Sequence, residues 1–90
     1  MTFDPVKRKS NLQKHRIDLA ECESAFDQPM LTREDGSETY GEQRLVSLAL
    51  LAGLVVVLVW IDREEGPRLI SCRKAKTYET QAYFRVFPPI

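Results

Sequence analysis

The stretch over residues 45–61 limits the fold more than any other, because its 17 residues carry no charge and most are Leu or Val. A helix that spans a membrane needs about 20 apolar residues, whereas this run is shorter and contains Ser47 and Gly53. Its second half is dominated by β-branched and aromatic residues, which pack well on a pleated sheet. The run therefore predicts two central strands. A protein anchored in a membrane by these residues is the alternative, and localisation would distinguish the two.

Turn residues set the bounds of the predicted strands. The pair Ala52-Gly53 supplies a turn between a strand over residues 44–51 and another over residues 54–61. A second turn over residues 62–67 leads to a strand over residues 68–73, in which apolar and polar side chains roughly alternate. The prediction is a small antiparallel sheet with three main strands.

Two helices are predicted before the sheet. Asp4 can cap the first, over residues 5–15, and proline at its first position loses nothing because that amide is unpaired anyway. The second covers residues 18–27, where Asp18 and Glu21 are spaced as in a capping box and the apolar residues fall on one stripe.

The remaining segments complete an α+β fold in a single domain over residues 1–86. Residues 30–33 predict a short edge strand, and the acids and turn residues at 34–37 predict a mobile loop. Helical spacing over residues 74–84 predicts a last helix that covers the sheet. Pro88 and Pro89 end any regular structure, so residues 87–90 are expected to form a loose tail.

Charge is distributed unevenly along a chain whose net charge is zero. Residues 1–17 and residues 66–90 each carry five basic and one acidic side chain, so each segment is +4, while residues 18–65 carry three basic and eleven acidic side chains and are −8. Either the ends and the middle pair with each other, or a polyanion contacts the ends and a basic partner covers part of the middle.

The two cysteines argue against a disulfide framework. Cys22 and Cys72 are predicted to be small buried residues, and no Cys/His spacing resembles a metal site. Charged and polar residues fill most of the first twenty positions, so no secretory signal is expected. The sequence favours the reducing cytoplasm.

The first predicted helix has a polar face that contains groups able to bind phosphate. Lys7, Asn11, Lys14 and His15 are separated by four, three and one residues, which places them within about 100° of arc at 100° per residue. The lysines and Asn11 can donate to phosphate oxygens, and a free histidine side chain, with a pKa of about 6.5, can transfer a proton. An ordinary solvated face, or a histidine that only caps or packs this helix, is the alternative.

Arg68 and Arg73 lie in and at the end of the last predicted strand. Regular alternation would place them on opposite sides of the sheet, although Arg73 could turn to either side where the strand ends. Guanidinium groups bind phosphate oxygens through paired hydrogen bonds and stabilise charge that develops on phosphorus. Since no metal cluster, glycine-rich phosphate loop or Ser/His/Asp order stands out, the remaining chemistry is RNA cleavage without a metal, in which the 2′-hydroxyl attacks the neighbouring phosphate.

In their order and separation, these elements resemble the BrnT family, toxins of bacterial type II toxin-antitoxin pairs. The resemblance covers about residues 3–84, and the N-x-x-K-H and R-x-I-S-x-R-K-A elements are its most specific parts. Arg16 departs from the glycine usual after the histidine, and Cys72 from the usual alanine. The matching residues are Asp4, Lys7, Asn11, Lys14, His15, Ala25-Phe26-Asp27, Gly41, Glu42, Arg44, the segment Arg68-Leu69-Ile70-Ser71-Cys72-Arg73-Lys74-Ala75, Glu79 and Tyr83.

The resemblance implies a RelE-like fold and a cytoplasmic endoribonuclease that needs no metal or other cofactor and inhibits translation. It also implies a BrnA-like ribbon-helix-helix antitoxin as partner, contact with DNA only through that antitoxin, and no membrane association. Carried onto matching positions, the expected catalytic residues are Lys7, His15, Arg68 and Arg73, and the expected RNA-binding residues are Asn11, Lys14 and, more weakly, Arg63. A non-catalytic module of the same fold that binds nucleic acid or an antitoxin is the alternative.

Overall fold

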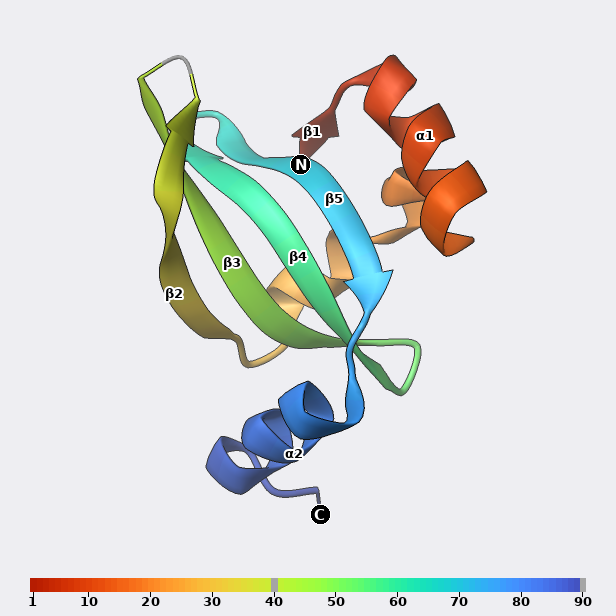
Figure 1. Cartoon of the computed structure of the whole chain (residues 1–90), viewed down its shortest axis with the longest axis vertical. Helices are drawn as coiled ribbons and strands as arrows, with labels where there is room; N and C mark the ends of the chain where they lie inside the picture. Colours follow the sequence, from red (N-terminus) through yellow and green to blue (C-terminus); the bar gives the residue numbers. More distant parts are fainter. Residues whose placement is uncertain (40, 90) are drawn as a thin grey trace.

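A computed structural model of the chain describes residues 1–39 and 41–89, and within them the chain forms one five-stranded sheet with the strand order β1-β5-β4-β3-β2 (Figure 1). Strand β1 is parallel to β5, and the other neighbours are antiparallel. In chain order the elements are β1 (Thr2–Phe3), α1 (Pro5–His15), the short 3-10 helices η1 (Leu19–Glu21) and η2 (Glu23–Asp27), β2 (Leu31–Thr39), β3 (Glu42–Leu51), β4 (Leu54–Arg63), β5 (Gly66–Lys74) and α2 (Thr77–Val86).

The uncharged run forms the hairpin of β3 and β4, which confirms the predicted strands. Ala52 and Gly53 connect them with φ values of 51° and 80°. A two-residue turn of type I′ requires positive φ at both central positions, and its twist matches that of the flanking strands. In the described residues, no helix has the length and apolar character that a membrane crossing requires.

Strand β5 contains a β-bulge at Ile70. Val59 of β4 pairs with Ser71 of β5, but the next residue, Trp60, pairs with Leu69, so β5 has one residue more than β4 at this point. An extra residue in one strand shifts the alternation of its side chains relative to its neighbour. Before the bulge, the odd-numbered residues of β5 lie on a given face of the sheet, and after it the even-numbered residues lie on that face.

The bulge changes which side chains of β5 share a face. Leu69 and Cys72, three residues apart, are both fully buried in one core cluster. Arg68 pairs with Ile61 and Arg73 with Val57, residues of β4 that lie on the other side. The regular alternation that would separate the two arginines does not hold, and both lie on the same face.

The two faces of the sheet are covered differently. We call the side that carries Val57, Val59 and Ile61 the outer face, and the opposite side the core face. The 3-10 helices run behind the sheet in Figure 1 and cover the core face, whereas α2 lies across one end of the outer face. The buried residues that pack on the core face are Leu19, Cys22, Ala25, Ala49, Val56, Leu58, Leu69 and Cys72.

Both cysteines are buried and free, as predicted. Interaction with the neighbouring Cys22 and burial raise the pKa of the Cys72 thiol. A raised pKa keeps this sulfur protonated, so Cys72 acts as a small apolar residue in the core.

The second helix predicted over residues 18–27 is inexact, because the segment forms two short 3-10 helices, η1 and η2, in place of one α-helix. Asp18 caps the first turn by accepting from the Ala20 amide at 3.0 Å. The buried side chains of Leu19, Cys22 and Ala25 follow each other at intervals of three residues. This spacing keeps them on one side of a 3-10 helix, which has three residues per turn.

Three further segments differ from the sequence-based expectations. Residues 34–37, predicted as a mobile loop, belong to β2, whose pairing with β3 is irregular between Glu34 and Glu38. The last helix begins at Thr77, because β5 continues to Lys74. Strand β1 was not predicted, since a strand of two residues is too short to show a period.

Candidate nucleic-acid interface

Asn11 fixes α1 to the edge of β5. Its Nδ2 donates to the carbonyl oxygens of Ile17 at 2.8 Å and Cys72 at 2.9 Å, and its Oδ1 accepts from the Cys72 amide at 3.1 Å. Asn11 is almost fully buried, with only 5% of its surface exposed. Asn11 therefore supplies the edge of β5 with the partners that another strand would give. Both ends of the Asn11 amide are therefore bonded within the protein.

A hollow of about 240 Å³ lies where α1 meets β5. We call it the α1 hollow. Four of its lining residues were expected to share a helix face, whereas Ser10, Ile70 and Ser71 were missed. Ser10 lies three residues after Lys7, so the same helical spacing could have found it. The lining residues are Lys7, Ser10, Asn11, Lys14, His15, Ile70 and Ser71.

The α1 hollow is cationic and rich in hydrogen-bond donors. Lys7, Ser10 and Lys14 are exposed, His15 is half-buried, and the described residues that line the hollow include no carboxylate. Ammonium groups and hydroxyls that face one hollow are suited to the oxygens of a phosphate. Lys14 and His15 also occupy the last turn of α1, where basic side chains interact favourably with the helix dipole.

Arg73 lies on the outer face near α2, where it is bound by Glu79. Its Nη1 and Nη2 donate to the two carboxylate oxygens of Glu79 at 2.9 Å each. The hydrogen bond from Arg73 lowers the pKa of Glu79, whose Oε1 also accepts from the Lys76 amide at 2.8 Å. A phosphate that binds both donors of Arg73 has to replace this carboxylate.

The structure places the other two predicted arginines outside the α1 hollow. Arg63 donates to both carboxylate oxygens of Glu42, at 2.9 and 2.7 Å, and this interaction lowers the pKa of Glu42. Arg68 donates to the Thr2 hydroxyl at 3.4 Å. Lys7, Lys14 and His15 are thus brought together, whereas Arg68 and Arg73 lie on the adjoining outer face.

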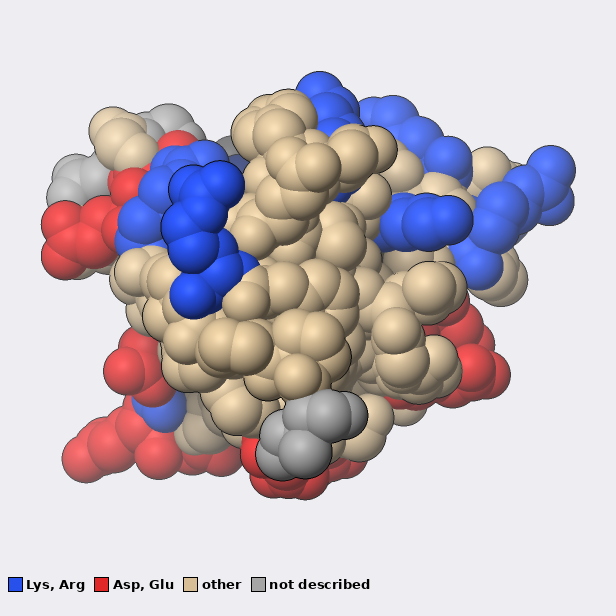
Figure 2. All heavy atoms as spheres, turned by 90° about the horizontal axis from the view of Figure 1, so that it is seen from below, with Lys and Arg blue, Asp and Glu red and all other residues tan. Residues whose placement is uncertain are grey.

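Basic and acidic side chains gather on different parts of the surface. Figure 2 shows lysines and arginines in two groups in the upper half of the view, with uncharged surface between them, while acidic side chains lie mostly to the left and below. The group on the right is on the side of α1, because both views share the horizontal axis. The exposed acids of the 3-10 helices are Glu21, Glu23 and Asp27.

This fold and this interface define a small α+β protein with a cationic surface suited to a polymer that contains phosphate. Residues 3–79 match a family model described as the ribonuclease toxin BrnT of type II toxin-antitoxin systems. The chain therefore belongs to the BrnT family of ribonuclease toxins, which confirms the resemblance seen in the sequence. The matched residues include all of α1, β5 and Glu79. No curated protein matches the chain significantly.

Membership of this family carries two consequences for the partners of the chain. A ribonuclease toxin acts on RNA, and a toxin of a type II pair has an antitoxin as its partner. The cationic surface of α1 and β5 accords with the first of these, since RNA presents a phosphate at every nucleotide.

Proposed function

We propose that the chain is an endoribonuclease that cleaves RNA without a metal ion in the α1 hollow and thereby inhibits translation in the cytoplasm. The observation that carries this proposal is the convergence of Lys7, Lys14 and His15 on one hollow, which has no carboxylate among its described lining residues. In the described residues, no group of three or more His, Cys, Asp or Glu side chains lies together as metal ligands would. We also propose the RelE-like fold that the family resemblance implies.

The proposed reaction is attack of an RNA 2′-hydroxyl on the adjacent phosphorus. The O2′–P bond forms as the P–O5′ bond breaks, which leaves a 2′,3′-cyclic phosphate and a 5′-hydroxyl. His15 takes the proton from the 2′-hydroxyl and delivers it to the departing 5′-oxygen, while Lys7 and Lys14 neutralise the charge on the phosphoryl oxygens. The hydroxyls of Ser10 and Ser71, which line the same hollow, orient the phosphate by donating hydrogen bonds.

Asn11 and the arginines have different parts in this proposal. Asn11 acts as a positioning residue, because it holds the helix that carries the reacting groups against β5. Arg68 and Arg73 contact the RNA beside the hollow, and Arg73 does so when a phosphate replaces Glu79 on its guanidinium. Arg63 is neutralised by its pair with Glu42, so it contacts RNA in this proposal only when a phosphate replaces that carboxylate.

Cleavage of single-stranded RNA by the purified chain tests the proposal, with a chelator of divalent ions present throughout. We expect His15→Ala to reduce the rate by about 100- to 10,000-fold, as for loss of a general acid or base. Lys7→Ala and Lys14→Ala should each reduce it by about 100-fold, as for loss of a group that stabilises a developing oxyanion. Mass spectrometry should detect cyclic phosphate ends.

Lys9→Ala is the matched control, because Lys9 is an exposed lysine of α1 outside the hollow. Its rate should equal that of the wild type. Equal cleavage by all variants would remove the assignment of the hollow, and loss of cleavage under chelation would contradict the metal-independent route.

A non-catalytic binding module is the second candidate, because His15 is the only histidine of the chain and no carboxylate from residues 1–39 or 41–89 lines the hollow beside it. Wild-type chain that binds RNA without product would establish this candidate. In either case we propose a BrnA-like ribbon-helix-helix antitoxin as the partner, with DNA contacted only through it.

A further inference from the structure

We infer that bound RNA continues from the α1 hollow across the outer face of the sheet, where Arg33 of β2 and Arg44 of β3 hold its backbone. This inference rests on the proposed function and extends it to a second contact surface, which lies on the same outer face but near the opposite edge of the sheet, at β2 and β3. Neither arginine belongs to the residues assigned to cleavage.

Strand register places these two arginines on the outer face with Arg68 and Arg73. Arg33 pairs with Val46, Val46 pairs with Val59, and Val59 pairs with Ser71. These pairs form one row across four strands that starts at Arg33 and ends at Ser71 in the α1 hollow.

A second row runs parallel to the first. Leu45 pairs with Trp60, so its neighbour Arg44 lies level with Ile61, which pairs with Arg68. Strands are about 4.8 Å apart, so the three steps from β2 to β5 cover about 14 Å. A single strand of RNA that is held at both ends of these rows must cross the sheet.

The arginines on β2 and β3 are available for phosphate. Arg63 and Arg73 each bind a carboxylate, but no ion pair in the described part of the chain involves Arg33, Arg44 or Arg68. The Nε atom of Arg44 is buried and has no hydrogen-bond partner among the described residues. A buried donor without a partner is costly, and in the proposed complex the Arg44 side chain turns outward so that this Nε donates to a phosphate oxygen.

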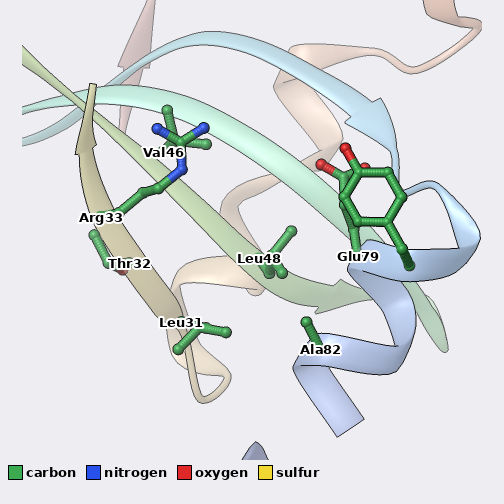
Figure 3. A pocket seen from close by; sticks show the side chains of 8 residues that line it. Leu31, Thr32, Arg33, Val46, Leu48, Glu79 and Ala82 are labelled. Carbon is green, nitrogen blue, oxygen red and sulfur yellow. The ribbon is translucent and has the colours of Figure 1, made fainter. Parts of the chain in front are cut away.

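A groove of about 320 Å³ lies on the outer face between β2, β3 and α2. Figure 3 shows Arg33 reaching from β2 over Val46, with Leu31, Leu48 and Ala82 further along the groove and Glu79 on α2. Tyr78 also lines the groove and is 66% exposed. Unpaired bases of single-stranded RNA stack on exposed aromatic rings and on apolar surface.

These features favour RNA over a protein segment as the occupant. Arg33 lines the apolar groove at β2, and the row of paired residues that starts at Arg33 ends at Ser71 in the cationic hollow at β5. A backbone with a charge at every nucleotide satisfies both ends, while its bases meet the apolar floor between them.

Binding of a fluorescent single-stranded RNA with 2′-O-methyl groups tests the inference, because methylation blocks the attacking hydroxyl and keeps the phosphates. We expect Arg33→Gln and Arg44→Gln each to weaken binding about tenfold, as for loss of a charge-assisted contact. The slope of log affinity against log salt should fall by about 0.7 for each variant, as for one lost phosphate contact with a single strand.

Lys9→Gln, which removes the same charge from the far side of α1, is the control and should change neither quantity. A 2′-O-methyl dinucleotide, too short to cross the sheet, should bind the wild type and Arg33→Gln equally. Arg33 is exposed, so Arg33→Gln keeps the inference testable if Arg44→Gln fails to fold.

Two results would overturn the inference. In the first, Arg33→Gln binds the long RNA as tightly as Lys9→Gln does. In the second, RNA affinity is unchanged but affinity for the antitoxin falls, which would make this surface an antitoxin site. Wild-type chain that neither binds nor cleaves RNA would instead refute the proposed function itself.

Discussion

At the scale of single residues, the end of α1 explains one departure from the family pattern. Arg16 has φ 60° and ψ 25°, the left-handed conformation, and its amide donates to the Leu12 carbonyl at 3.0 Å. Glycine adopts this conformation at no steric cost, whereas a side chain is strained there. The glycine that the family resemblance leads us to expect at this position would fit this backbone without strain, whereas Arg16 adopts the same helix exit at a cost.

We predict that Arg16→Gly raises the free energy of unfolding by about 1 kcal/mol, because it removes the strain of a left-handed side chain. Urea unfolding followed by circular dichroism would measure the change. Gln13→Gly is the matched control, since Gln13 is exposed within α1 and glycine there should lower the free energy of unfolding by about 1 kcal/mol. A decrease for Arg16→Gly would contradict the strain argument.

The depth of a side chain could not be read from the helical spacing alone. The sequence correctly grouped Lys7, Lys14 and His15 with Asn11, because angular position depends only on separation along the helix. Asn11 nevertheless faces the edge of β5, where its amide bonds Cys72. That contact joins residues 61 positions apart, and a local pattern carries no information about it.

At the scale of elements, the side-chain amide of Asn11 joins α1 to β5 through two hydrogen bonds with Cys72. We predict that Asn11→Ala lowers the free energy of unfolding by about 2 to 4 kcal/mol, because it leaves the buried amide and carbonyl of Cys72 without their partner. Equilibrium unfolding in urea would measure the loss, and RNA cleavage should fall in the same variant.

Gln13→Ala is the control for this prediction, because it shortens an exposed polar side chain of the same helix. Its stability and cleavage rate should match the wild type. If Asn11→Ala lost cleavage at unchanged stability, Asn11 would be a direct RNA contact, as the sequence first suggested, and its positioning role would be refuted.

Elements with strong local signals were predictable, whereas those set by packing were not. Caps and proline defined α1, and β-branched residues defined β4. The spacing of Leu19, Cys22 and Ala25 fits an α-helix and a 3-10 helix about equally, so packing on the core face decided between them.

At the scale of the whole molecule, the proposed RNA contacts adjoin one another. The α1 hollow and the outer face share Ser71, so a partner that covers this region blocks both surfaces at once. The sequence placed the basic residues at the two ends of the chain, but only the strand order, with β1 and α1 beside β5, brings the two ends together.

We predict that inducing the chain in bacteria arrests growth and that co-expression of the neighbouring reading frame relieves the arrest, because the type II family pairs a toxin with an antitoxin. Growth curves with and without the neighbour would measure this. His15→Ala should not arrest growth, whereas Lys9→Ala should. Arrest by His15→Ala at equal expression would separate toxicity from RNA cleavage.

The bulge at Ile70 has a consequence for how such a chain can change over time. Because the bulge takes up the extra residue, a β5 without Ile70 would pair regularly with β4 and would still place Arg68 and Arg73 on the outer face, four positions apart. The number of residues between the two arginines can therefore change by one without turning either side chain to the core face. Related chains can thus lose or keep the bulge while both arginines stay on the same face.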